Sequence, residues 1–162
     1  MRVEEGRIGD AVGAVERLYE EHSARLWRSL VLFSGDREIA SDAVSEAFVQ
    51  LLGRGSAVRD PARWIWRAGF RIAAGLLKER GGSTPMIVEP ERAYEVPDPL
   101  PAIVEGLRRL SPKQRSSVVL HHYAGYPLAD VARIIGSTTA AVGVHLHRGR
   151  NRLRQLLEDD DA

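Results

Sequence analysis

The stretch that most constrains the fold is residues 127–157, PLADVARIIGSTTAAVGVHLHRGRNRLRQLL. Its pattern predicts two helices joined by a tight turn. The first helix covers about 128–135, and Gly136 supplies the left-handed conformation that ends a helix at little cost. Ser137 or Thr138 can then cap the second helix. In that helix, residues at steps of three and four form one buried stripe: Val142, Leu146, Gly149, Leu153 and Leu156.

The opposite face of the second helix is rich in groups that bind nucleic acid. At about 100° per residue, another set of side chains lies opposite the stripe: Ala140, Val144, His147 and Asn151. Four arginines, at positions 148, 150, 152 and 154, surround this set, and no acidic residue follows until Glu158. An ordinary surface helix mixes the two signs of charge. The pattern therefore favours a helix-turn-helix that reads DNA over a merely solvated helix.

Composition excludes several classes of protein. The net charge of +1 is low for a nucleic-acid binder, so any basic surface must be local. The absence of cysteine excludes disulfides, thiol nucleophiles and cysteine-based zinc sites. The histidine pairs 121–122 and 145–147 diverge by about 100° and about 200° on a helix, so we expect no metal, no cofactor and no enzyme activity. No signal peptide or long apolar span is visible, and we expect a cytoplasmic protein.

Two helices are predicted in the first 52 residues. The first covers 10–33, after polar residues 1–9 that we expect to fray. Ser34, Gly35 and Asp36 are expected to end the first helix and cap the second, which covers 37–52. Its outer face combines acidic and aliphatic side chains: Glu38, Ile39, Asp42, Glu46 and Val49. An acidic face repels phosphate and suits a protein partner, although two ordinary exposed aliphatic residues are an alternative explanation.

A third helix begins at Asp60 and Pro61, which serve as N-cap and first helical residue. Its outward face combines basic and aromatic side chains: Arg63, Arg67, Phe70, Arg71 and Lys78, with Trp66 beside them. Such a face suits single-stranded nucleic acid, because charge follows the phosphates and each stacked base contributes about 1–3 kcal/mol. The alternative is that the rings belong to a helical core. We favour that alternative for Trp64 and leave it open for Trp66 and Phe70.

Residues 81–99 divide the chain into two helical units. This segment holds glycines, prolines and four acidic residues against one arginine, a composition that cannot fold alone. The second unit begins near Leu100, and Ser111, Pro112 and Gln114 form a capping box with proline at the first helical position. The predicted fold is all-α, with a three-to-four-helix domain at 1–80, an acidic Pro-rich linker at 81–99 and a helix-turn-helix domain at 100–162. We expect the two modules to have separate cores.

With these motifs described, the chain resembles a bacterial RNA polymerase sigma factor of the extracytoplasmic-function (ECF) group. The segment RLSPKQRSSVVLHHYAGYPLADVARIIGSTTAAVGVHLHRGRNRLRQLLE resembles region four of the family, which reads the minus-thirty-five promoter element. GDREIASDAVSEAFVQLL and DPARWIWRAGFRIAAGLL resemble region two, which docks on the polymerase and melts the minus-ten element. The resemblance covers roughly residues 11–80 and 100–157.

The resemblance implies three sets of site residues. Contacts to the minus-thirty-five element would come from Thr138, Thr139, Val144, His147, Arg148, Arg150, Asn151 and Arg154. Contacts to the minus-ten element would come from Arg54, Arg59, Arg63, Trp66, Arg67, Phe70, Arg71 and Lys78. Contacts to the polymerase would come from Ile39, Asp42, Glu46, Val49 and Gln50. Residues 141–145 lack the Lys or Arg that many members carry. Either promoter affinity would be weak, or recognition would depend on phosphate contacts and DNA shape.

The resemblance also implies a function and a set of partners. The partners are the polymerase core, through the clamp helices of its largest subunit and its flap, promoter DNA, and an anti-sigma factor. The predicted function is promoter-specific transcription initiation, with no catalytic residue, no cofactor and no membrane segment of its own. Two alternatives stay open: a sigma-like regulator that binds DNA without initiating transcription, and an interaction protein that sequesters polymerase or an anti-sigma factor.

Overall fold

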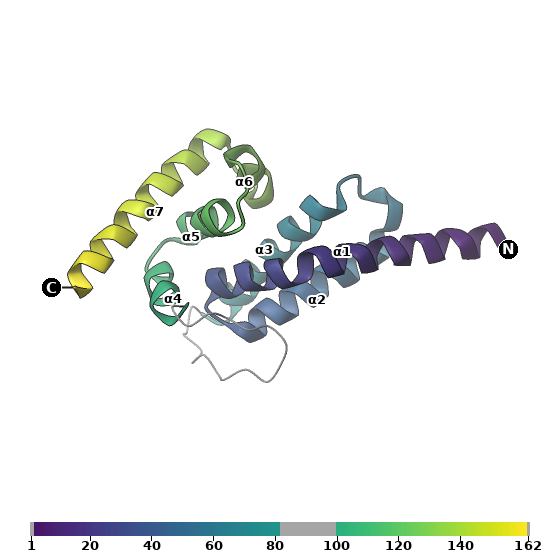
Figure 1. The fold of residues 1–162 in the computed structure, drawn as a ribbon, viewed down its shortest axis with the longest axis horizontal. Coiled ribbons are helices and arrows are strands. Elements are labelled where there is room, and N and C mark those ends of the chain that lie inside the picture. Colours follow the sequence, from purple (N-terminus) through teal and green to yellow (C-terminus); the bar gives the residue numbers. More distant parts are fainter. Residues whose placement is uncertain (1, 82–99, 162) are drawn as a thin grey trace.

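The longest element is α1 (Arg2–Ser34), a single helix of 33 residues. The computed structural model describes residues 2–81 and 100–161 of the chain. The second half of α1 is packed among other helices, whereas its first half projects past them (Figure 1) and leaves apolar side chains exposed: Val3, Ile8 and Val12. The prediction that residues 1–9 fray is therefore wrong for residues 2–9. Once the packed half of a helix has formed, adding further turns costs little.

Two helices complete the N-terminal unit, α2 (Arg37–Arg54) and α3 (Pro61–Glu79), with a short 3-10 turn, Gly55–Ala57, between them. The predicted caps are confirmed. Asp36 accepts hydrogen bonds from the N–H groups of Glu38 and Ile39 at 2.8 and 3.2 Å, and Asp60 accepts one from the N–H of Arg63 at 3.1 Å. Each carboxylate satisfies backbone donors that a helix start leaves unpaired. The apolar faces of α1, α2 and α3 meet inside the unit.

The C-terminal unit contains α4 (Leu100–Arg108), α5 (Pro112–Val118), a π-helical turn Val119–Tyr123 (η2), α6 (Leu128–Ile135) and α7 (Thr139–Asp160). The capping box is confirmed, since Ser111 and Gln114 exchange two hydrogen bonds of 3.2 Å. α7 lies close to α5, because a Cβ atom on Gly149 would stand only 3.0 Å from a methyl group of Val118. The described residues contain helices and no strand, which confirms the all-α prediction.

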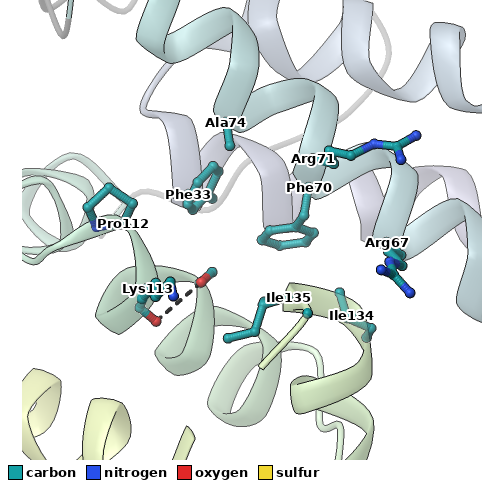
Figure 2. Close-up of a pocket in the computed structure, with 11 residues that line it drawn as sticks. Phe33, Arg67, Phe70, Arg71, Ala74, Pro112, Lys113, Ile134 and Ile135 are labelled. Atoms are coloured by element: carbon teal, nitrogen blue, oxygen red, sulfur yellow. Dashed lines mark hydrogen bonds between the residues drawn. The ribbon is translucent and has the colours of Figure 1, made fainter. Parts of the chain in front are cut away.

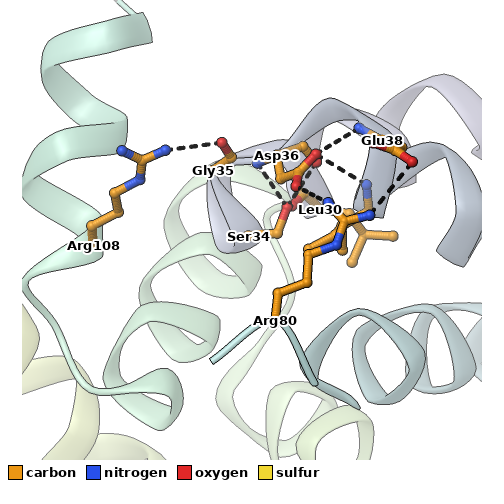
Figure 3. A network of polar contacts seen from close by, with 8 residues as sticks. Leu30, Ser34, Gly35, Asp36, Glu38, Arg80 and Arg108 are labelled. Carbon is orange, nitrogen blue, oxygen red and sulfur yellow. Dashed lines mark hydrogen bonds and ion pairs between the residues drawn. The ribbon is translucent and has the colours of Figure 1, made fainter. Parts of the chain in front are cut away.

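The turn between α1 and α2 joins the two units through a polar network (Figure 3). The buried cap Asp36 forms an ion pair with Arg80, which follows α3. Arg108, at the end of α4, donates a hydrogen bond of 3.0 Å to the carbonyl oxygen of Gly35. Gly35 has φ 69°, in the left-handed region, and a Cβ atom there would meet the Arg108 guanidinium at 2.6 Å. Glycine at this turn therefore permits both the backbone conformation and the contact between units.

Replacing Gly35 with alanine is expected to lower the free energy of unfolding by about 1–2 kcal/mol, because the left-handed backbone is strained with a Cβ atom and Arg108 must move. Gly53→Ala is the matched control. Gly53 lies in α2 with a negative φ and no atom within 4 Å of the new methyl group, so this change should stabilise the helix by about 0.5–1 kcal/mol. Denaturant unfolding measures both values. Equal effects of the two variants would contradict the role given to Gly35.

The two helical units pack against each other. α3 contacts α6, and α1 contacts α4, α5 and η2. The buried apolar residues form one continuous cluster that runs from Leu26 and Phe33 through Phe70 to Val131 and Leu146. The expectation of separate cores is therefore wrong for this conformation, which we call the closed arrangement. The physical reason is that α1 and α3 each present apolar side chains on two sides, and the second side covers the C-terminal unit.

Two further predictions concern the linker and the membrane. Residues 82–99, which carry the predicted acidic linker, lie outside the described residues. No helix in the described parts of the chain combines the length and apolarity that a membrane span requires.

Candidate nucleic-acid interface

The helix-turn-helix formed by α6 and α7 has the predicted local geometry. Gly136 ends α6 with φ 66° and ψ 46°, and the Thr138 hydroxyl caps α7 by accepting a hydrogen bond of 3.1 Å from the N–H of Ala141. Val142, Leu146 and Leu156 are buried, and Leu153 is half-buried. These contacts fix which side of α7 is turned away from the protein, as the predicted stripe required.

The outer side of α7 carries the predicted minus-thirty-five set. Val144 and His147 are exposed and Asn151 is half-exposed, and the amide nitrogen of Asn151 lies 3.2 Å from Nε2 of His147. Thr138, Thr139 and the remaining members of the set are also exposed: Arg148, Arg150 and Arg154. None of the α7 arginines forms an ion pair with a carboxylate within residues 2–81 and 100–161. This side therefore offers uncompensated positive charge around a small polar and apolar centre.

The closed arrangement buries some residues of the predicted minus-ten set and leaves others exposed. The structure buries Trp66 (0% exposed) and Phe70 (4% exposed), so the outward position given to Phe70 is wrong and the core alternative left open for both rings is the one observed in this arrangement. Trp66 donates a hydrogen bond of 3.1 Å to Nδ1 of His22 and packs edge-on against Tyr126 at a ring distance of 5.1 Å. Phe70 packs against Phe33 at 5.3 Å. The rings are thus used by the protein itself in this arrangement.

The charged members of the minus-ten set have different environments. Arg63 is half-buried and donates a hydrogen bond of 3.0 Å to the carboxylate of Asp130 in α6. Arg54 lies over the half-buried ring of Trp64, 5.5 Å from its centre, which agrees with the core placement favoured for that tryptophan. The remaining members are exposed: Arg59, Arg67, Arg71 and Lys78. A basic surface along α3 is therefore present without its aromatic component.

A groove lies between α3 and the C-terminal unit, with a volume of about 370 Å³. Figure 2 shows apolar side chains from both units facing it, Phe33 and Phe70 on one side and Ile134 and Ile135 on the other. Its other lining residues include three cationic side chains: Arg67, Arg71 and Lys113. The sequence did not predict this groove, because its walls meet only through contacts between the two units.

Most side chains of the predicted polymerase-binding set on α2 are at the surface. Asp42, Glu46 and Val49 (62% exposed) lie on the surface, and Gln50 donates a hydrogen bond of 2.9 Å to Glu46. Ile39 is 0% exposed, so its outward placement is wrong. It lies in the first turn of α2, where the reversal from α1 brings neighbours that helix periodicity does not represent.

Sequence reasoning missed Leu52 on the same helix. Leu52 is 50% exposed, three positions after Val49, and residues at that spacing are neighbours on a helix surface. The step from Val49 to Leu52 was a signal that could have revealed it. The exposed surface of α2 is therefore acidic at Asp42 and Glu46 and apolar at Val49 and Leu52.

Three titratable groups in the C-terminal unit have shifted pKa values. Burial, and next the neighbouring Arg108 guanidinium, lower the pKa of Arg115, whose cationic group lies 5.2 Å from the centre of the Phe33 ring. Burial raises the pKa of Tyr126, so its phenol stays protonated. Burial, with His121 and Arg150 as smaller causes, lowers the pKa of His122, so its imidazole adds no charge beside α7 at neutral pH. The described residues contain no cluster of side chains that could hold a metal ion.

Comparison with known proteins gives a consistent assignment. Residues 101–153 match the family model described as Sigma-70, region 4. The ECF RNA polymerase sigma factor SigM of Mycobacterium tuberculosis is 31% identical over 151 residues, which cover 89% of this chain and 77% of SigM. BldN of Streptomyces coelicolor, also an ECF RNA polymerase sigma factor, is 29% identical over 98% of this chain, and the match spans 65% of the length of BldN.

A solved structure shares the fold. The sigma factor RpoE from Bartonella quintana, crystallised with the anti-sigma factor NepR, superposes with a TM-score of 0.75 over 88% of this chain and 96% of RpoE, at 20% identity. This likeness concerns the arrangement of helices alone. Together, the region 4 match and the extended identity with SigM place this protein in a known group: the chain belongs to the ECF RNA polymerase sigma factors.

Proposed function

We propose that the chain is a promoter-specificity subunit of RNA polymerase, which binds the core enzyme and directs it to promoters. The observation that carries the proposal is the outer side of α7. It joins a region 4 sequence to four arginines that have no carboxylate partner in the described part of the chain. Affinity for DNA comes largely from such contacts with phosphates. The polymerase supplies the chemistry, and this chain supplies recognition.

At the upstream promoter element, α7 would enter the major groove. Val144 can contact a thymine methyl group, and the Asn151 amide, held near His147, can reach a base edge or a phosphate. The surrounding arginines would hold the helix on the backbone. Few base-specific donors are present between positions 141 and 145, so DNA shape and phosphate contacts would carry much of the recognition.

At the polymerase, two surfaces would make contact. The acidic and apolar face of α2, including Val49 and Leu52, suits the clamp helices of the largest subunit. A second groove of about 210 Å³ lies between α4 and α7. Its lining is apolar at Ile103, Leu153 and Leu157 and charged at Glu105 and Arg109. An apolar groove of this kind accepts an amphipathic helix, and we assign it to the flap. An anti-sigma protein is a further proposed partner, of the kind crystallised with the sigma factor RpoE.

The double variant Val49→Asp/Leu52→Asp is expected to weaken binding to core polymerase at least tenfold, about 1.4 kcal/mol, because it places two carboxylates where apolar contacts form. Both side chains are exposed, so the fold should be retained. Val3→Asp on the projecting half of α1 makes a similar change at a more exposed valine and should leave binding unchanged. Titration of labelled protein with core enzyme measures the affinities. Equal binding by the double variant and the wild type would contradict this docking surface.

Reconstitution with core polymerase tests the function itself. Core enzyme plus this chain should form open complexes on a cognate promoter that core alone does not form, detected by permanganate reactivity of unpaired thymines. Tight duplex binding by the free chain, without open complexes when core is added, would favour a regulator that does not initiate transcription. Binding to core without any promoter contact would favour a sequestering protein.

A further inference from the structure

The first half of α1 carries an apolar stripe that the rest of the described chain leaves largely exposed. Residues 2–12 are all exposed, and Figure 1 shows this half of the helix projecting beyond α2 and α3. At about 100° per residue, an arc of about 60° holds four apolar side chains: Ile8, Val12, Val15 and Tyr19. The same arc in the second half of α1 holds Leu26 and Phe33, which are buried. The stripe that forms core at one end of α1 therefore continues on the surface at the other.

The projecting half has a sequence that is poor at maintaining a helix by itself. Gly6, Gly9 and Gly13 each cost about 1 kcal/mol relative to alanine in a helix interior. A Cβ atom on Gly6 or Gly9 would meet no atom within 4 Å, so no neighbour in the described residues requires glycine there. Most helical stability in proteins comes from the packing of an apolar face rather than from propensity. A partner on the stripe would supply that packing.

The stripe is complementary to itself when two copies of the helix run antiparallel. Two residues then face each other if they lie equally far, in opposite directions, from the two-fold axis between the copies. An axis halfway between positions 13 and 14 places Ile8 opposite Tyr19 of the second copy. The same axis places Val12 opposite Val15. The steps of four, three and four residues between these positions are those of a coiled-coil contact, and they read the same in both directions.

Two charged side chains beside the stripe follow the same symmetry. Arg7 and Glu20 lie equally far from the same axis, on opposite edges of the stripe, each about 110° from its centre. Both are exposed, and neither forms an ion pair within residues 2–81 and 100–161. They are about 20 Å apart along the helix, so they cannot pair within one chain. An antiparallel pair of helices brings each Arg7 beside Glu20 of the other copy, whereas a parallel pair would place like charges together.

We propose that the projecting half of α1 is a self-association surface, on which a second copy of this chain packs the same segment antiparallel. The overlap covers residues 5–22 of each copy, about 27 Å of helix. A contact of that length is smaller than the roughly 1,200–2,000 Å² of a standard interface. The dimer is therefore reversible, with a dissociation constant of about 10 µM. The surface lies far from α7 (Figure 1), and the proposal does not depend on the proposed function.

Sedimentation velocity of the full chain between about 1 and 200 µM tests the association, because the dimer fraction follows mass action. The mean mass should rise from that of one chain toward that of two. Val12→Asp should weaken association at least tenfold, since two carboxylates would face apolar Val15 side chains. Val3→Asp is the matched control: it makes the same change at a more exposed valine, about 150° from the centre of the stripe, and should have no effect. A single-chain mass at every concentration, or equal effects of the two variants, would overturn the proposal.

Charge reversal tests the antiparallel arrangement. Arg7→Glu alone and Glu20→Arg alone each place like charges at both ends of the contact. Exposed ion pairs have modest strength, so each single variant should associate about two- to tenfold more weakly. The double variant Arg7→Glu/Glu20→Arg restores opposite charges, keeps the net charge of the chain, and should associate as the wild type does. A double variant as weak as either single variant would overturn the proposed pairing.

Core polymerase is the other possible occupant of the stripe, and the two valine variants distinguish it from a second copy. Core enzyme is titrated with each variant below the dissociation constant of the dimer. Val12→Asp should then bind core as tightly as Val3→Asp and the wild type. Weaker binding of Val12→Asp to core, with unchanged self-association, would assign the stripe to the polymerase and overturn the proposal.

Spin labels measure the register of the dimer directly. The chain has no native cysteine, and Ala14 and Glu21 are exposed, so Ala14→Cys and Glu21→Cys each carry one label per copy. Along the helix axes, the two Ala14 positions of a dimer would lie about 2 Å apart and the two Glu21 positions about 22 Å apart. The distance between labels should therefore be clearly longer for Glu21→Cys. Equal distances would indicate a parallel pair and would overturn the proposal.

Discussion

Trp66→Ala is expected to lower the free energy of unfolding by about 3–5 kcal/mol, the range for removal of a large aromatic side chain from a core. The ring has no exposed surface, bonds to His22 through its indole N–H and packs against Phe70 and Tyr126. The substitution would therefore leave a cavity, an unpaired acceptor and a weakened contact between the units. Thermal or urea unfolding followed by circular dichroism measures the loss.

Trp64→Ala is the natural comparison for Trp66→Ala. Trp64 is two positions earlier on α3, is only half-buried and packs beneath Arg54. Its removal should cost much less than that of Trp66. If instead the Trp66 variant keeps wild-type stability and loses only affinity for single-stranded DNA, the ring is exposed in the free protein. The closed arrangement would then not be its main state.

The double variant Arg148→Ala/Arg150→Ala is expected to lower promoter affinity of the reconstituted holoenzyme about 10- to 100-fold. The variant removes two exposed cations without carboxylate partners from α7, so binding to DNA releases about two fewer counterions. The slope of log affinity against log salt should accordingly fall by about 1.8. Filter binding at several salt concentrations gives both quantities.

Arg7→Ala/Arg17→Ala provides the control for the arginine prediction. Both residues are exposed on the projecting half of α1, so this variant has the same loss of net charge away from α7. Its promoter affinity and salt slope should stay close to wild type. Normal transcription by the Arg148/Arg150 variant would favour an interaction protein that does not read promoter DNA.

Local features of the fold were predictable from the sequence. The caps at Asp36, Asp60 and Ser111 and the glycine turn at Gly136 depend on neighbouring residues alone, and the structure has each of them. The buried stripe of α7 was predictable for the same reason, because its period reflects one helix against one neighbouring surface. The exposed side of α7 followed directly from that stripe.

Features that depend on two units meeting were not predictable. Helix periodicity shows that Trp66 and Phe70 lie on one side of α3. It does not show whether that side stacks on bases or packs against another helix, because both uses require aromatic side chains. The side of α3 that carries these rings was therefore left open between a DNA contact and a core, and the structure buries it. Ile39 was misplaced for a related reason, since the reversal between α1 and α2 adds neighbours from outside its own helix. The groove beside Phe70 has the same origin.

The closed arrangement has different effects on the two predicted nucleic-acid surfaces, on α7 and on α3. The outer side of α7 remains uncovered, whereas the rings of α3 are enclosed. In the closed arrangement, a contact with double-stranded DNA through α7 would need no movement of the two units, whereas stacking of a base on the rings of α3 would need one.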